Sequence, residues 1–330
     1  MFSSPSGLTS LLLVSFLRML SRLLDFPKRA RMSQAYDYLT PYPVPIQTLT
    51  LTDGTQVAVT DTGAGRETLV LVHGLSSSLM VWQKNLAQLG QHFRCVAIDL
   101  PGYGRSPRAP RTLDMIYFSS VVMEVIYRMG IRQANLVGHS MGGQVSMTTA
   151  LRYPHSIRRL ILAAPAGLER FNRLQAAALR KSFKPEALAK ATRESITKNV
   201  RYSLYRFEPD AQFMIEDRVN LAETPHFDDY CHTVSESVSA MTNGPVWEYL
   251  PHIMQETLIL MGENDPLIPN RLFSPMLKPR QVAEAGAARI AHSTLQMVPR
   301  CGHFVPFEQP DLFNDAVRDF VFDEKMINKD

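Results

Sequence analysis

Short runs of apolar residues recur along most of the chain and define the elements that we predict first. In the runs at 69–72 (Leu-Val-Leu-Val) and 258–261 (Leu-Ile-Leu-Met) every residue is apolar, which is typical of strands covered on both faces. Parallel strands are buried in this way. We therefore predict strands over 46–52, 56–61, 68–73, 94–99, 134–138, 159–164, 257–262 and 294–299.

Helical patterns fill several gaps between these runs, near residues 80–90, 112–129, 141–153 and 309–322. Strands that alternate with helices predict a doubly wound α/β sheet. Asp53-Gly54 separates the first two runs and is a hairpin signal, so the sheet should open with an antiparallel pair. The prediction is a mostly parallel eight-stranded sheet flanked by helices.

The alternation stops between residues 165 and 250, where the pattern is helical and no convincing strand occurs. An all-helical insertion between two strands of the sheet would form a lid. We predict a helical cap over 168–250 and a core made of 46–167 and 251–330. The proline-rich segment 32–45 before the core is typical of an extended linker.

The segment before the linker has an apolar face and a polar face. Over residues 8–26, polar residues recur at spacings of three and four, which predicts an amphipathic helix. Its longest apolar stretch, 11–17, is well short of the roughly 20 residues that cross a bilayer. A basic cluster follows at 28–31, so contact of 8–31 with an anionic membrane surface is one expectation. The alternatives are a helix that packs on the protein itself, and an extension that is cleaved or that precedes a start at Met32.

Charge and cysteine content narrow the classes of function. The first 31 residues hold five basic residues and one acidic residue, so they account for the whole formal net charge of +4. The rest of the chain is neutral, which is unlike a nucleic-acid-binding protein. The three cysteines are far apart and form no CxxC pair, so neither a disulfide framework nor a zinc site is expected. A reducing, cytoplasmic setting fits best, with or without peripheral membrane contact.

The segment Gly138-His139-Ser140-Met141-Gly142 fits the G-x-S-x-G pattern and stands between a buried run and a helical pattern. In that context the glycines allow a sharp strand-to-helix turn, which exposes the serine hydroxyl on a strained backbone. The N-terminus of the following helix places positive dipole beneath a developing anion. We predict that Ser140 is a nucleophile, and the alternative is a glycine turn with an idle serine.

A serine hydroxyl needs an adjacent base, which a third group must hold in one tautomer. His303, in the loop after the last predicted strand, is the candidate base, and Asp265, just past strand 257–262, is the candidate acid. All three residues follow the carboxyl ends of strands, where open α/β sheets place their sites. The alternatives are that Asp265 caps a helix while Glu263 is the acid, and that His303 is an ordinary loop residue.

Acyl transfer also needs hydrogen-bond donors that point at the oxyanion of the tetrahedral intermediate. The backbone N–H of Met141, next after the serine, is one candidate, and the backbone N–H of Leu75 is the other, with Ser76 as its alternative. Gly74 allows the backbone to approach closely, and His73 is expected to brace this loop rather than to act as a base.

Two further features are assigned supporting roles. His139, inside the G-x-S-x-G pattern, is expected to support the site. The glycine-rich segment 99–106 contains neither G-x-x-x-x-G-K-[ST] nor G-x-G-x-x-G, so we interpret it as a structural turn at the rim of the site. The sequence therefore predicts no cofactor and no metal ion.

Five blocks together resemble the α/β-hydrolase family, in the order in which that family has them. They are 73–74, 99–106, 138–143, 262–266 and 302–303. Over about residues 46–323 the chain is similar to the branch with a serine nucleophile and a helical cap. Members of the family that attack saturated carbon carry aspartate at the nucleophile position, so the resemblance implies that Ser140 attacks a carbonyl carbon.

The resemblance implies carboxylic esters first, then thioesters, amides, lactones or the carbon–carbon bonds of vinylogous diketones. The carbon–carbon hydrolases share Ser-Met-Gly-Gly at 140–143, but they more usually have asparagine at the position of His139. They also have a longer glycine-rich oxyanion loop than Gly74-Leu75-Ser76-Ser77-Ser78. The stretch 269–293 is longer than is usual in the family.

We therefore expect a metal-independent hydrolase that cleaves the ester of a small, largely apolar acyl substrate. A carbon–carbon hydrolase, an acyltransferase and a receptor-like binding protein with negligible turnover stay open. The cap has ten basic and three acidic residues over 168–206, but one basic and nine acidic residues over 207–250. Either the two halves pair as solvated helical faces, or the basic half and the N-terminal helix together dock on lipid.

Overall fold

The computed structural model describes residues 36–63 and 65–322. The chain divides into two compact units, Met1–Asp37 and Tyr38–Asp330, and the second unit contains every helix and strand given below. The amphipathic helix expected over 8–31 lies outside the described residues. In the part that is described, every helix is too short or too polar to cross a bilayer.

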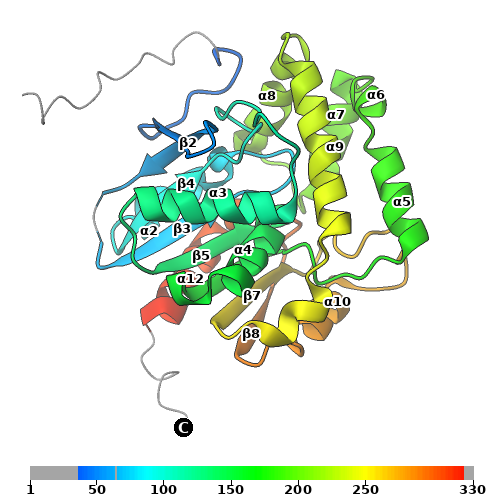
Figure 1. The fold of residues 1–330 in the computed structure, drawn as a ribbon. Coiled ribbons are helices and arrows are strands. Elements are labelled where there is room, and N and C mark those ends of the chain that lie inside the picture. Colours follow the sequence, from blue (N-terminus) through cyan, green and yellow to red (C-terminus); the bar gives the residue numbers. More distant parts are fainter. Residues whose placement is uncertain (1–35, 64, 323–330) are drawn as a thin grey trace, which may run out of the picture. The chain divides into compact units, whose positions relative to one another are not determined.

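One eight-stranded sheet forms the centre of the second unit (Figure 1). Its strands lie in the order β1-β2-β4-β3-β5-β6-β7-β8, and all pairs are parallel except β1 with β2 and β2 with β4. The predicted strands and the antiparallel opening are therefore present, with bounds that differ by at most two residues. The strands are β1 (Gln47–Thr50), β2 (Gln56–Asp61), β3 (Glu67–Val72), β4 (Phe93–Ile98), β5 (Ala134–His139), β6 (Ile157–Ala163), β7 (Glu256–Gly262) and β8 (Ser293–Val298).

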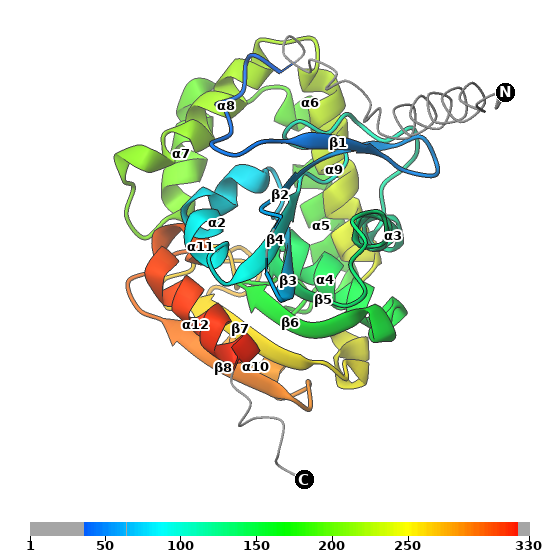
Figure 2. The same cartoon turned by 90° about the vertical axis from the view of Figure 1, so that its left-hand side faces the viewer.

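Helices cover both faces of the sheet because its central strands are apolar on both sides. Every residue of β5 is buried, as are the last four of β3. Helices α3 and α4 pack together on one face, and α2 and α12 pack together on the other (Figure 2). These helices are α2 (Gln83–Leu89), which follows the 3-10 turn η1 (Leu79–Trp82), α3 (Met115–Arg128), α4 (Met141–Arg152) and α12 (Pro310–Phe322).

Two helices of the core were not predicted. Helix α10 (Pro279–Ala287) lies in the long stretch before β8, and the short α11 (Val305–Glu308) follows the candidate histidine. The 3-10 turn η2 (Pro154–Ser156) leads into β6. Helix α10 gives the long stretch 269–293 part of its structure.

The segment between β6 and β7 contains helices and no strand. In Figure 1 its helices α5 to α9 stand together beside the sheet, at the upper right. Asn172 and Thr192 each begin a helix there with a reciprocal capping box. The elements are α5 (Arg173–Ser182), α6 (Pro185–Leu188), α7 (Arg193–Ser203), η3 (Pro209–Ala211), α8 (Phe213–Ala222), α9 (Phe227–Asn243) and η4 (Trp247–His252).

The oppositely charged halves of this helical segment pair with each other only in part. Arg193 of the basic half donates two hydrogen bonds to Glu216 of the acidic half, at 2.9 and 3.0 Å. The acidic half also pairs with the core, where Arg108 lies 2.7 Å from Glu236. Beside α5, Arg170 pairs with Glu248 of the acidic half at 3.0 Å, whereas Arg173 and Lys181 of α5 have no ion pair within the described residues.

Candidate active site

Ser140 stands at the tight turn between β5 and α4. Its φ of 54° and ψ of −119° lie outside the regions that non-glycine residues ordinarily adopt. The surrounding structure holds this strained backbone, since Ser140 N–H donates to the Ala163 carbonyl of β6 at 3.0 Å. A Cβ on Gly142 would collide with the carbonyl oxygens of Val72 and His73, so only glycine lets α4 lie this close to β3.

We expect Gly142→Ala to destabilise the fold by roughly 1–3 kcal/mol, because the atoms that the new methyl group meets are backbone atoms of a central strand. Chemical denaturation of the two proteins measures this difference. Gly286→Ala in α10 is the matched control, since the atoms nearest to its methyl group belong to the Leu168 side chain, which can shift more easily than backbone. Equal losses of stability in the two variants would contradict the account.

The structure brings the three residues of the predicted catalytic group together. His303 Nε2 lies 2.9 Å from Ser140 Oγ, and His303 Nδ1 lies 2.8 Å from Asp265 Oδ2. Asp265 Oδ1 accepts from the N–H groups of Leu267 at 2.8 Å and Ile268 at 3.0 Å, which fixes the carboxylate. With Asp265 as acceptor, Nδ1 carries the imidazole proton and Nε2 accepts from the serine hydroxyl.

The alternative acid, Glu263, points elsewhere. Its side chain is 44% exposed and pairs with Arg280 at 3.4 Å, whereas Asp265 is fully buried against His303. Asp265 is thus the acid that contacts the imidazole in this structure.

The loop after β3 passes directly beside the serine. A Cβ on Gly74 would lie 2.9 Å from Ser140 Cβ, so the backbone that leads to Leu75 is within reach of the reacting centre. Among the described residues no backbone acceptor is bonded to the N–H of Leu75, and Met141, the first residue of α4, has an N–H that the helix itself does not use. Ser76, the alternative donor, has a φ of 53°, in the left-handed region that non-glycine residues seldom adopt.

A cap residue that was not predicted holds this loop from outside. Arg218 of α8 donates to the Ser76 carbonyl oxygen at 2.7 Å. It is the one basic residue in the acidic half of the cap, and that isolation could have singled it out in the sequence.

His73 ties this loop to the next turn. Its Nε2 accepts from Leu100 N–H at 3.0 Å, so its Nδ1 is the donor to the Gly74 carbonyl at 2.7 Å. Burial lowers the pKa of His73 to about 4, and the ring is neutral near neutral pH. In that turn, buried Asp99 accepts from the N–H groups of Leu79 at 2.7 Å and Arg105 at 2.9 Å, although burial raises its pKa to about 6. Segment 99–106 is a hydrogen-bonded structural turn.

His139 contacts the loop of the candidate base. Its Nε2 lies 3.0 Å from the His303 carbonyl oxygen, to which it donates as a neutral ring. Burial, and then the neighbouring His303, lower the pKa of His139 well below its usual value. The strand-to-helix turn that carries Ser140 therefore also holds the loop around His303, which we call the base loop.

Glu308 is a second anchor of the base loop, and the sequence did not reveal it. Its partly buried carboxylate accepts from the N–H groups of Gly302 at 3.1 Å and Phe304 at 3.0 Å, on either side of His303. It also accepts from Tyr205 N–H of the cap at 2.7 Å. Burial raises the pKa of Glu308, while the three N–H donors oppose that shift.

The base loop also lies directly on the cap backbone. His303 N–H donates to the Ser203 carbonyl at 2.9 Å. A Cβ on Gly302 would lie 2.6 Å from Tyr205 N and 2.8 Å from Ser203 O, so this position has no room for a side chain. The end of α7 and the candidate base are therefore one packed unit.

A family profile described as "Alpha/beta hydrolase family" matches residues 69–316, which is most of the chain and includes every residue of the site. The chain belongs to the alpha/beta hydrolase family. The eight-stranded, mostly parallel sheet flanked by helices is the fold of that family.

Relatives of this alpha/beta hydrolase include proteins with different named activities. A 2-hydroxy-6-oxononadienedioate/2-hydroxy-6-oxononatrienedioate hydrolase from Paraburkholderia phymatum is 26% identical, over 82% of this chain and 93% of its own. A probable hydrolytic enzyme from Pseudomonas aeruginosa PAO1 has a TM-score of 0.77 at 22% identity, over 85% of this chain and 95% of its own. An esterase from Exiguobacterium antarcticum has a TM-score of 0.68 at 21% identity, over 83% and 98%. The two structural likenesses support the fold.

In this hydrolase we expect Glu308→Gln to lower kcat by roughly 10- to 100-fold, because a small displacement of a catalytic group is that costly. The amide NH2 would face a backbone N–H that now donates to a carboxylate oxygen. Steady-state kinetics should show the loss in kcat rather than in KM. Glu284→Gln, an exposed acid of α10, is the control. Lower stability with an unchanged kcat would show that Glu308 does not position His303.

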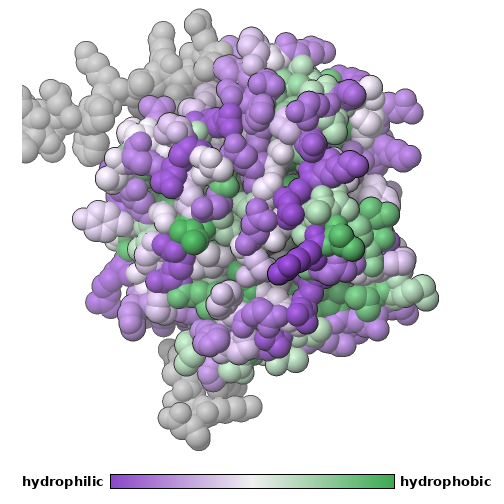
Figure 3. All heavy atoms as spheres, turned by 45° about the vertical axis from the view of Figure 1, so that its right-hand side comes forward, coloured by the Kyte–Doolittle hydropathy of each residue, from purple (hydrophilic) through white to green (hydrophobic). Residues whose placement is uncertain are grey.

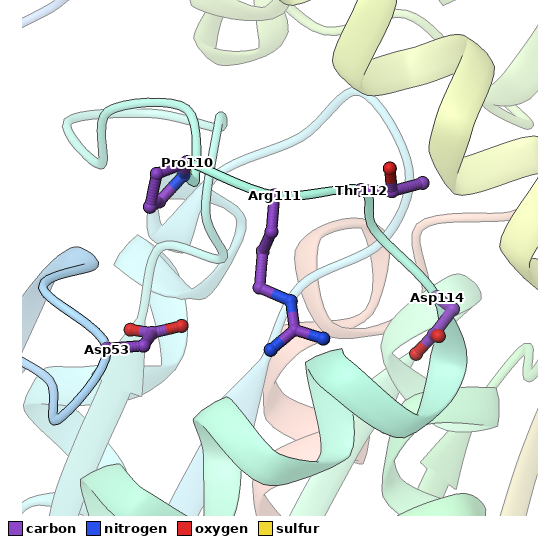
Figure 4. Close-up of a pocket in the computed structure, with 5 residues that line it drawn as sticks. All are labelled: Asp53, Pro110, Arg111, Thr112 and Asp114. Atoms are coloured by element: carbon purple, nitrogen blue, oxygen red, sulfur yellow. The ribbon is translucent and has the colours of Figure 1, made fainter.

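A hollow elsewhere on the surface is separate from this group of residues. It is lined by Asp53, Pro110, Arg111, Thr112 and Asp114 (Figure 4). Its acids have local structural roles: Asp53 accepts from Thr55 N–H at 3.0 Å, and Asp114 caps α3 by accepting from Tyr117 N–H at 2.6 Å. The hollow lies beside the β1–β2 turn, whereas Ser140, Asp265 and His303 follow β5, β7 and β8.

Proposed function

We propose that this hydrolase cleaves a carboxylic ester of a small, largely apolar substrate through an acyl-enzyme on Ser140. The proposal rests on one chain of contacts, from Ser140 Oγ to His303 Nε2 at 2.9 Å and from His303 Nδ1 to Asp265 Oδ2 at 2.8 Å. His303 is the general base and Asp265 orients it. Such a chain makes a serine hydroxyl nucleophilic near neutral pH.

In the first half of the proposed reaction, Ser140 Oγ bonds to the carbonyl carbon while its proton passes to His303 Nε2. The carbonyl oxygen becomes an anion, which accepts from the N–H groups of Leu75 and Met141. Each such donor contributes roughly 2.7–4 kcal/mol to the stability of the transition state. The imidazolium, stabilised by Asp265, then gives its proton to the leaving alcohol as the carbon–oxygen bond breaks.

In the second half, water attacks the acyl carbon while His303 accepts the water proton. The bond from Ser140 Oγ to the acyl carbon then breaks, His303 returns the proton to Ser140 Oγ, and the carboxylic acid leaves. Residues of the chain thus serve every proton transfer and the developing negative charge, so the proposed reaction uses no metal ion or cofactor. Apolar side chains of the cap, such as Phe213, Tyr230 and Met241, pack against the hydrophobic core. Ligand sites are lined mainly by apolar side chains, so we infer an apolar substrate from this composition of the cap.

Hydrolysis of a carbon–carbon bond is the second candidate, because relatives such as the hydrolase from Paraburkholderia phymatum are carbon–carbon bond hydrolases. Two features favour an ester instead. His139 stands where the carbon–carbon hydrolases more usually have asparagine, and here it holds the base loop. The oxyanion loop Gly74-Leu75-Ser76-Ser77-Ser78 is also shorter than the glycine-rich loop of those hydrolases.

A substrate panel separates the candidates. The protein is assayed with p-nitrophenyl esters of increasing chain length and with a vinylogous diketone, alone and with added alcohol. We expect ester turnover that exceeds diketone turnover, with water as the main acyl acceptor. Faster diketone cleavage would favour the carbon–carbon hydrolase, alcoholysis above hydrolysis an acyltransferase, and no turnover with any substrate a binding protein.

A further inference from the structure

The loop that follows Asp265 exposes several large apolar side chains. Leu272 is 75% exposed and Met276 is 88% exposed, and Leu267 and Leu277 are also open to solvent. The loop is not loosely placed, since Arg271 donates to the Leu277 carbonyl at 2.9 Å. Compact loops that expose this much apolar surface are unusual away from interaction sites.

The start of the cap extends the same surface. Glu169 accepts from Asn270 N–H at 2.8 Å, and the Phe171 and Phe273 rings meet edge to face at 6.0 Å. Leu174, at the beginning of α5, is 83% exposed. Figure 3 brings forward the side of the unit that carries α5 and shows hydrophobic atoms gathered there among hydrophilic ones. We call Leu174, Leu267, Leu272, Met276 and Leu277 the apolar surface.

Basic residues accompany the apolar surface. The two segments that form it, 168–182 and 266–278, hold six basic residues and one acidic residue, Glu169. The Glu169 carboxylate already accepts a hydrogen bond from Asn270 N–H. Of the six basic residues, Arg170 forms an ion pair within the described part of the chain, with Glu248 at 3.0 Å. The others are Arg173, Arg180, Lys181, Arg271 and Lys278.

We propose that the apolar surface docks onto an anionic lipid membrane. Exposed leucine and methionine side chains can enter the boundary between headgroups and acyl chains, and basic residues around them attract anionic headgroups. A second copy of the chain is a poorer occupant, since symmetric pairing would bring two basic surfaces together. The loop begins one residue after Asp265, so docking would bring the candidate active site close to lipid. The proposal does not depend on which bond the enzyme cleaves.

Site-specific fluorescence tests this surface in the full chain. The native cysteines Cys95, Cys231 and Cys301 are buried, so a thiol-reactive, polarity-sensitive dye can be placed on Met276→Cys. Met254→Cys, 69% exposed and outside the surface, is the matched control. With phosphatidylcholine vesicles that contain phosphatidylglycerol, we expect a blue shift for the dye at 276 and none at 254. Because the dye reports its own position, binding through residues 1–31 does not imitate this result.

Equal shifts at the two positions, or none at either, would overturn the proposal. A shift at 276 that grows with protein concentration without vesicles would mean that a second copy covers the surface, and an equal shift with phosphatidylcholine alone would exclude the role of anionic lipid. Leu272→Ser and Met276→Ser should each weaken vesicle binding about tenfold, the fold-change for burial of one such side chain. Met254→Ser should leave it unchanged.

Discussion

Replacing Ser140 by alanine should reduce ester turnover on the order of 10⁶-fold, the loss seen when the nucleophile of a serine hydrolase is removed. The reason is that no other hydroxyl occupies the position 2.9 Å from His303 Nε2 within the described residues. Hydrolysis of an activated p-nitrophenyl ester by the two proteins measures the ratio.

Ser146→Ala is the control for the Ser140 variant. Ser146 lies in α4, the helix that follows Ser140, and its hydroxyl donates to the Gly142 carbonyl at 2.7 Å rather than to His303. We expect it to keep nearly full turnover, while Ser140→Ala loses it with an unchanged fold by circular dichroism. Comparable turnover by wild type and Ser140→Ala would exclude the acyl-enzyme on Ser140.

Asp265→Asn should lower kcat about 10⁴-fold, a loss that arises when the wrong imidazole tautomer is stabilised. The amide can donate to His303 Nδ1, which would move the ring proton to Nε2 and leave nothing to accept the serine proton. The remaining amide oxygen can still accept from Leu267 and Ile268, so the loop should stay in place. The kcat of purified variant and wild type on one ester measures the effect.

Glu263→Gln is the matched control for Asp265→Asn, because Glu263 lies two residues away in the same loop and pairs with Arg280 at the surface. It should change kcat less than twofold, as expected for an exposed pair. The reverse pattern, a large loss for Glu263→Gln and full activity for Asp265→Asn, would assign the acid to Glu263.

Several parts of the fold could be predicted because the sequence encodes them locally. Strands such as β3 and β7 are nearly continuous apolar runs, and few other structures bury such a run on both faces. Ser140, Asp265 and His303 each follow a predicted strand, so their order along the chain could be predicted as well. The contacts among Ser140, His303 and Asp265 then arise because the carboxyl ends of parallel strands meet at one edge of the sheet.

The missed features depend on contacts between distant parts of the chain. Glu308 is an acid in a short helix, and nothing local shows that its carboxylate accepts from Gly302 and Phe304 or that it reaches Tyr205 across the cap boundary. Helix α10 buries Val282, Ala283 and Gly286, but two of these are small and give little hydrophobic signal. Which supporting groups surround a site is thus set by tertiary packing, which local patterns do not contain.

The central claim is that Ser140 is a nucleophile activated by His303. Its most direct test is incubation of the full-length protein with a fluorophosphonate, with wild type, Ser140→Ala and Ser146→Ala compared by intact mass and by peptide mapping. We predict one adduct on wild type and on Ser146→Ala, located at Ser140, and none on Ser140→Ala. An adduct on Ser140→Ala, or an unlabelled wild type that is folded, would contradict the account.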